Sequence, residues 1–133
     1  MSNANRKLLD AIVQMFATGD LSEARAVFAP DYIDHQGLGE TQIRGAEGFR
    51  RVVTAARAAF VTLDVRVEDV ISEGDKLAAR IHWRGTRREP SAGMLGAVDR
   101  ETIELLRFRD AQVVEHWGAR LWISGTERED DLR

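Results

Sequence analysis

Residues 107–117 have the sequence RFRDAQVVEHW, and this stretch decides how the fold of the chain is interpreted. Valine and tryptophan favour strands, so the stretch predicts a strand, a tight turn at Asp110-Ala111 and a return strand. Successive side chains of a strand point to opposite faces of a sheet. The return strand therefore presents only alternate members of the run Glu115, His116 and Trp117 to a pocket.

The length of the turn sets which of them face the pocket, because a slip of one residue exchanges the two faces. A two-residue loop places Arg107 with His116, whereas a three-residue loop places it with Glu115 and Trp117. The two-residue type I′ loop requires positive φ at both central residues, which the Cβ of Ala111 resists. The sequence thus favours the longer loop, with His116 facing outward and a pocket lined by Trp83, Leu105, Arg107, Glu115, Trp117 and Leu121. Arg107 and Glu115 then lie opposite each other, either as a buried pair or at the solvated rim.

Composition restricts the class of protein. A chain of 133 residues with 44% hydrophobic content forms one domain that buries roughly two-thirds of its unfolded surface. The sequence has no cysteine, which excludes disulfides, thiolate zinc sites and a cysteine nucleophile. A net charge of −3, from 19 basic and 22 acidic residues, offers no attraction to nucleic acid. The N-terminal residues contain no unbroken apolar run, so we expect neither a signal peptide nor a membrane span, and a cytoplasmic protein.

Helical periodicity dominates the first half of the chain. Apolar residues at three- and four-residue spacing predict a first helix over residues 8–16 that ends at Gly19-Asp20. A short second helix is predicted from Ser22, as N-cap, to Phe28, before Pro30. Residues 31–35 form a short extended segment, and a third helix is predicted over residues 46–60.

Strand periodicity dominates the second half. Alternation begins at Leu63 and reaches a turn cluster at residues 72–75, and further strands are predicted over residues 76–88, 100–109 and 113–122. Three N-terminal helices followed by this antiparallel meander predict an α+β fold, with the helices packed on a strongly curved antiparallel sheet that encloses a pocket. Residues 1–125 form the domain, and residues 126–133 form a flexible charged tail.

Four motifs, by their order and spacing, resemble the SnoaL-like polyketide cyclases of the NTF2-like superfamily over residues 5–122. They are the run from Phe28 to His35, the Gly45-x-x-Gly48-Phe49 segment, the Arg84-Gly85-Thr86 segment, and residues 107–117. The resemblance implies an α+β cone that forms a homodimer through the outer faces of its sheets. It also implies an intramolecular aldol reaction that closes a ring in a polyketide ester without metal or cofactor.

The resemblance also bears on the site residues. The family's acid/base aspartate, four residues after the motif tryptophan, is Leu121 here, and the position of its partner histidine holds Arg107. A leucine cannot transfer a proton, whereas an arginine can donate to an oxyanion. His35 matches the family's pocket histidine, a residue type that can carry a proton. Its neighbour Asp34 points the opposite way on an extended segment and is expected to be solvated or to act as a cap.

The candidate catalytic residues are therefore His35 as proton carrier, Arg107 as oxyanion donor, and Glu115 as an acid. The candidate ligand contacts are Tyr32, Phe49, Trp83, Leu105, Trp117 and Leu121. No metal is expected, since His82 and His116 lie on strands about 10 Å apart and are predicted to pack on the outer face or in a dimer contact.

Three functions remain open. The first is cofactor-independent cyclisation, or a related isomerase or lyase reaction, on a small hydrophobic carbonyl or polyketide-like ligand. The second is a non-catalytic ligand-binding or accessory protein, for which Leu121 is the evidence. The third is a hydrolase or hydroxylase that uses Glu115.

Overall fold

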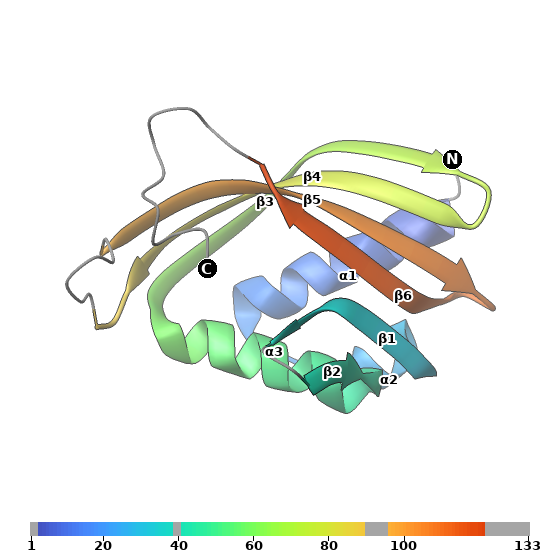
Figure 1. The fold of residues 1–133 in the computed structure, drawn as a ribbon, viewed down its shortest axis with the longest axis horizontal. Helices are drawn as coiled ribbons and strands as arrows, with labels where there is room; N and C mark the ends of the chain where they lie inside the picture. The colour runs from blue at the N-terminus through green and yellow to red at the C-terminus, as the bar shows by residue number, and fades with distance from the viewer. Residues whose placement is uncertain (1–2, 39–40, 90–95, 122–133) are drawn as a thin grey trace.

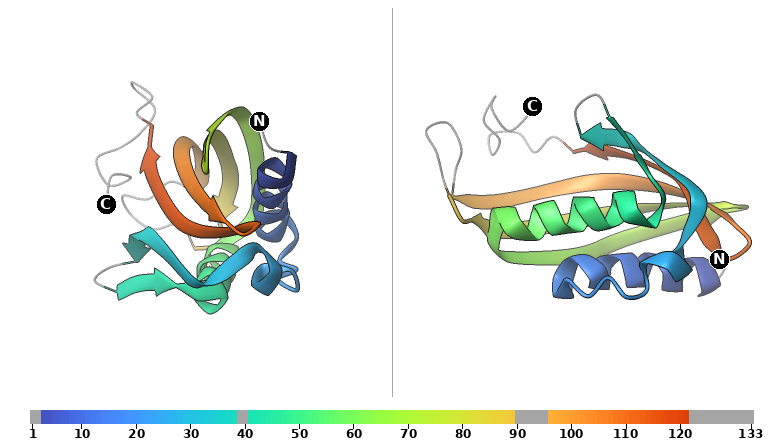
Figure 2. Two further views of the ribbon diagram at one scale, coloured as in Figure 1. Left: turned by 90° about the vertical axis from the view of Figure 1, so that its right-hand side faces the viewer. Right: turned by 90° about the horizontal axis from the view of Figure 1, so that it is seen from below.

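The computed structural model describes residues 3–38, 41–89 and 96–121. Its centre is a six-stranded, strongly curved and unclosed sheet with the strand order β2-β1-β6-β5-β4-β3. The helices α1 and α3 run along the concave side of this sheet (Figures 1 and 2). The elements are α1 Asn3–Thr18, α2 Ala24–Val27, β1 Phe28–Leu38, β2 Thr41–Arg44, α3 Gly45–Ala59, β3 Phe60–Glu73, β4 Lys76–Arg87, β5 Ala97–Arg109 and β6 Gln112–Arg120.

The helices follow from local sequence signals. The helix α1 ends where predicted, because Gly19 takes a φ of 76° and its N–H donates to the carbonyl of Met15 at 2.9 Å. The predicted Ser22 cap is wrong: Ser22 N–H donates to Asp20 Oδ1 at 3.0 Å within the preceding turn, and Glu23 occupies the N-cap of α2. The amphipathic helix α3 buries Gly48, Phe49 and Val53.

The sheet differs from the predicted four-stranded antiparallel meander. The extended segment at residues 31–35 belongs to a strand of 11 residues, β1, which pairs antiparallel with β2 and parallel with β6. The pairing of β1 with β6 shifts register between Phe28 and Ile33, which accommodates Pro30 and its missing N–H. Since α3 follows β1 and β2, the prediction of three helices N-terminal to the whole sheet is wrong.

The turn between β5 and β6 also differs from the prediction. It is a two-residue loop in which Asp110 and Ala111 have φ values of 51° and 62°. The β5–β6 register shifts beside this loop, so that Arg107 pairs with Glu115. The three-residue loop is therefore wrong, although Arg107 and Glu115 do lie opposite each other.

The core lies between the concave face of the sheet and the helices. Its largest fully buried side chains are Tyr32, Leu9, Leu77, Val53 and Val113. No helix in the described part of the chain is both long and apolar enough to cross a membrane. The predicted tail at residues 126–133 lies outside the described residues.

Candidate functional site

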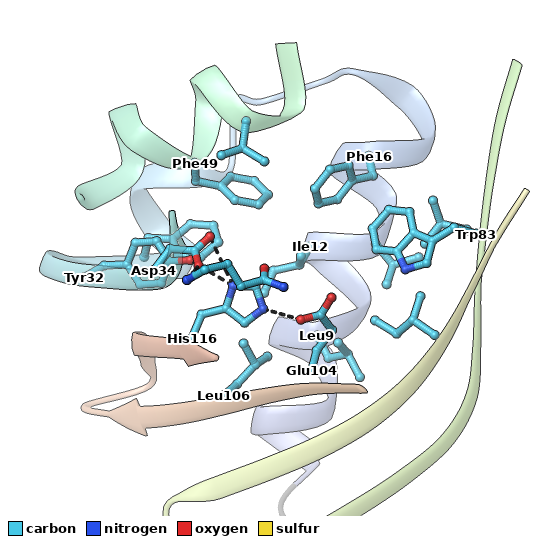
Figure 3. Close-up of a pocket in the computed structure, with 16 residues that line it drawn as sticks. Leu9, Ile12, Phe16, Tyr32, Asp34, Phe49, Trp83, Glu104, Leu106 and His116 are labelled. Carbon is cyan, nitrogen blue, oxygen red and sulfur yellow. Dashed lines mark hydrogen bonds and ion pairs between the residues drawn. The ribbon is translucent and has the colours of Figure 1, made fainter. Parts of the chain in front are cut away.

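A cavity of about 240 Å³ opens between α1, α3 and the concave face of the sheet (Figure 3). Its walls are largely apolar, with the aromatic rings of Phe16, Phe49 and Trp83 on one side. The polar side chains that line it come from β1, β5 and β6 and are Tyr32, Asp34, Gln36, Glu104 and His116. An apolar cavity with a few converging polar groups is the usual form of a small-molecule site.

A buried histidine between two carboxylates forms the polar end of this cavity. Asp34, Glu104 and His116, here called the inner cluster, have side chains that are 8%, 10% and 16% exposed. The Nε2 atom of His116 lies 2.6 Å from Glu104 Oε2, and its Nδ1 atom lies 3.3 Å from Asp34 Oδ2 (Figure 3). Both ring nitrogens thus face a carboxylate oxygen.

This arrangement determines the charge of the histidine. Burial lowers the pKa of His116, but the hydrogen bonds and negative charges of Asp34 and Glu104 outweigh burial and raise that pKa to about 9. At neutral pH the ring is therefore an imidazolium that donates from both nitrogens. The positive ring and the two negative charges that raise its pKa leave the inner cluster with one excess negative charge.

Neighbouring groups hold the two carboxylates in place. The Thr102 hydroxyl donates to Glu104 Oε1 at 3.0 Å and accepts from Trp83 Nε1–H at 2.9 Å. The backbone N–H of Gln36 donates to Asp34 Oδ1 at 2.9 Å. A Cβ atom at Gly118 would overlap the ends of the Gln36 and Glu104 side chains, so a larger residue here would displace them.

Burial also affects the phenol beside the inner cluster. The Tyr32 hydroxyl lies 3.5 Å from His116 Nδ1, and burial followed by the charges of Asp34 and Glu104 raises the pKa of the phenol. Tyr32 therefore stays neutral at physiological pH.

The cavity contains only part of the predicted ligand-contact set. Tyr32, Phe49 and Trp83 line it, whereas Leu105, Trp117 and Leu121 do not. The predicted catalytic residues His35, Arg107 and Glu115 do not line it either. The β4–β5 register explains the difference, because Trp83 pairs with Arg100 and so places Thr102, Glu104 and Leu106 on the concave face. The residues between them, Leu105 among them, point to the outer face.

The predicted catalytic residues meet each other, but on the outer face of the sheet. Glu115 accepts from Arg107 Nε at 2.6 Å and lies 2.8 Å from His35 Nε2. The His35 ring stacks on Trp117 with centroids 5.1 Å apart. His35, Arg107 and Glu115, here called the outer cluster, have side chains that are 32%, 29% and 24% exposed. Hydrogen bonds from His35 and then Arg107 lower the pKa of Glu115, which is therefore ionised at neutral pH.

Sequence reasoning missed the inner cluster. It predicted Asp34 to be solvated or a cap and His116 to face outward, but Asp34 is buried and both side chains line the cavity. It did not single out Glu104, although a lone acid in the apolar run from Ile103 to Leu106 was the available signal. His82, by contrast, lies on the outer face and pairs with Asp99 and Glu68.

The inner cluster does not present a set of metal ligands. Asp34 and Glu104 contact opposite nitrogens of the His116 ring, so the three side chains do not converge on one point. Across the described ranges no group of three or more His, Cys, Asp or Glu side chains is arranged to hold a metal ion.

Comparison with known proteins identifies the family. The family model of the SnoaL-like polyketide cyclases matches residues 6–120. The chain belongs to this family. Among proteins of curated function, none is similar to it in sequence.

Solved structures agree with the family. The SnoaL-like chain is similar to IdmH, a candidate polyketide cyclase from Streptomyces antibioticus, with a TM-score of 0.75, 27% identity, and 90% of this chain and 92% of IdmH covered. It is similar to AclR, a candidate hydroxylase from Streptomyces galilaeus, with a TM-score of 0.70, 28% identity, and coverage of 90% and 77%. TsrD from Streptomyces laurentii, with a TM-score of 0.77, 20% identity, and coverage of 90% and 90%, shares the fold.

Proposed function

We propose that this SnoaL-like protein is a cofactor-independent enzyme that moves a proton next to a carbonyl group of a small hydrophobic, polyketide-like molecule. The observation that carries the proposal is the inner cluster, in which a buried imidazolium lies between two carboxylates at the end of an apolar cavity. Buried titratable groups with perturbed pKa values in a pocket are typical of acid–base catalysis.

Glu104 is the proposed base. Its carboxylate borders the cavity described above and a second cavity beside it, whereas Asp34 binds the backbone of β1 through Oδ1. The imidazolium of His116, with Asp34 behind it, fixes the Glu104 carboxylate and stabilises its negative charge. Glu104 takes a proton from the carbon next to the carbonyl, which leaves an enolate. The enolate attacks a second carbonyl of the same molecule. The alkoxide formed by ring closure then takes the proton back from Glu104.

The enolate oxygen requires a donor. Gln36 borders both cavities, and its amide N–H groups lie close to Glu104 across Gly118. A neutral donor at this position stabilises the developing oxyanion without removing charge from the base. The reaction as proposed uses no metal and no cofactor, and it takes place in a cytoplasmic homodimer.

Proton exchange on a simple ketone tests the proposal. In D2O, the wild-type protein is expected to accelerate exchange of the C1 protons of 2-tetralone, followed by NMR. Glu104→Gln keeps the shape of the side chain but removes the base, so the rate is expected to fall by roughly 100-fold or more. Unchanged exchange in Glu104→Gln would exclude Glu104 as the base.

Glu115→Gln is the matched control, because it makes the same substitution on the outer face. It is expected to retain exchange within about twofold of the wild-type rate. A large loss in this variant would instead support the hydrolase or hydroxylase hypothesis built on His35, Arg107 and Glu115. Binding of 2-tetralone without any acceleration would support a ligand-binding or accessory role.

A further inference from the structure

A second cavity of about 330 Å³ adjoins the first, and Gln36, Trp83 and Glu104 line both. It differs in charge from the first, because Arg84, Arg100 and Arg120 line it and Glu104 is the acid among its lining residues. The shared residues put the largely apolar first cavity next to a cavity lined by cationic side chains.

Arg120 lies at the end of a row of inward-facing residues on β6. This row contains His116 and Gly118, and Gly118 pairs with Glu104 while Arg120 pairs with Thr102. At about 3.3 Å per residue, the backbone positions of His116 and Arg120 are about 13 Å apart. A molecule that contacts both the inner cluster and Arg120 must therefore be elongated.

The Arg120 guanidinium has one hydrogen-bonding group that the described part of the chain does not satisfy. Its Nη1 atom is buried and has no hydrogen-bond partner among the described residues. A buried donor without a partner is unfavourable for folding, and charged donors are the most unfavourable, so such a group calls for an explanation. Arg84, in contrast, lies at the rim, where it is 59% exposed and 3.6 Å from Asp99.

We propose that the second cavity binds an oxyanionic group at one end of the substrate and that Arg120 is its main ligand. The inference rests on the proposed function, since the other end of the same molecule carries the carbonyl group that Glu104 acts on. Guanidinium groups bind carboxylate and phosphate oxygens through charge-assisted hydrogen bonds. Two acids and one cation line the first cavity, whereas three arginines and one acid line the second, so the substrate enters with its oxyanion at Arg120.

The test uses three probes with an eight-carbon alkyl chain: nonanoate, octyl phosphate and the neutral ester methyl nonanoate. Binding is measured by isothermal titration calorimetry at pH 7. The wild-type protein is expected to bind at least one of the two anions roughly 10-fold more tightly than the ester. The anion that binds more tightly identifies the oxyanion class.

Arg120→Gln is expected to weaken binding of that anion by about 10-fold or more and to leave binding of the ester within about twofold. Arg120→Lys, which keeps the charge but loses the planar fork, is expected to fall between the two. The matched control is Arg66→Gln, because Arg66 is 64% exposed on β3, next to the cavity-lining Val65, and so points to the opposite face. It is expected to bind all three probes as the wild type does.

An anion-to-ester affinity ratio that is the same in wild type and Arg120→Gln would overturn the proposal, as would the absence of anion binding. Retained ester binding shows that the variant is folded. The outcome is independent of the proton-exchange test. If Glu104→Gln exchanged protons as fast as the wild type while Arg120→Gln still lost anion binding, the proposed reaction would be rejected and the oxyanion site would stand.

Discussion

The inner and outer clusters each take one residue from the same two pairs of sequence neighbours. Asp34 and His35 are neighbours on β1, and Glu115 and His116 are neighbours on β6, yet one member of each pair lies in the cavity and the other on the outer face. Each cluster joins a histidine to one or more acids within 3.5 Å. The clusters therefore have similar chemistry in different surroundings.

Surroundings decide what each histidine does. The His116 side chain is 16% exposed and bound to two acids, which raises its pKa to about 9. The His35 side chain is 32% exposed and shares Glu115 with Arg107. Water screens the outer ion pairs, whereas an apolar wall strengthens the inner ones. Burial, not residue type, therefore separates a candidate catalytic group from a surface ion pair.

The largest expected difference between the clusters concerns stability. His116→Ala leaves Asp34 and Glu104 buried without their shared cation, so it is expected to lower the free energy of unfolding by about 3 kcal/mol or more at pH 7. His35→Ala removes a partly exposed partner and is expected to lower it by about 1 kcal/mol or less. Urea denaturation followed by circular dichroism measures both. Equal losses in the two variants would contradict the difference in burial.

The next difference is in pH dependence. The pKa of His116 is raised in the folded state from 6.5 to about 9, so the folded state holds its proton more tightly than the unfolded state. The stabilisation due to the His116 proton is complete below pH 6.5. It decreases as the pH rises from 6.5 and is lost above about pH 9. Unfolding free energies measured between pH 6 and 10 are expected to show a decline of about 3 kcal/mol.

Two variants separate this decline from other titrations. His116→Gln is expected to remove it, because glutamine carries no titratable proton in this range. His82→Gln, on the outer face, is expected to keep it. A decline that survives in His116→Gln would show that another group is responsible.

The sequence predicts most of the elements, because their signals are local. The end of α1 at Gly19, the length of α3 and the strands from β3 to β6 agree with the structure within a few residues at most ends. The parallel pairing of β1 with β6 could not be predicted, since it joins residues such as Asp34 and His116 that are far apart in the chain. The short strand β2 follows a glycine-rich loop that shows no strand period.

The candidate site depends on the same distant pairing. Period-two alternation correctly separates Glu115 from His116, but it does not say which face is the inside. The β4–β5 register decides which face is the inside, because it places Glu104 on the same face as Trp83. The turn at residues 110–111 and the register beside it then place His116 on that face as well. Family resemblance directed attention to Leu121, whereas in this chain Asp34 and Glu104 supply the carboxylates of the cavity.

The smallest expected effect concerns the turn that holds the two clusters on their own faces. Ala111 has a φ of 62°, a left-handed conformation that a Cβ disfavours and glycine adopts freely. Ala111→Gly is therefore expected to stabilise the protein by about 0.5–1 kcal/mol, measured by urea denaturation. Gly74→Ala is the matched reverse change in the β3–β4 hairpin, where φ is 58° and a Cβ would meet nothing within 4 Å.

Gly74→Ala is expected to destabilise by a similar amount, because only the backbone strain changes. If Ala111→Gly destabilised the protein, the two-residue turn would not be the conformation that sets the β5–β6 register. A one-residue slip would exchange the faces of Glu115 and His116. The pH-dependent stability due to His116 would then disappear. If it persists in Ala111→Gly, the turn keeps His116 on the inner face.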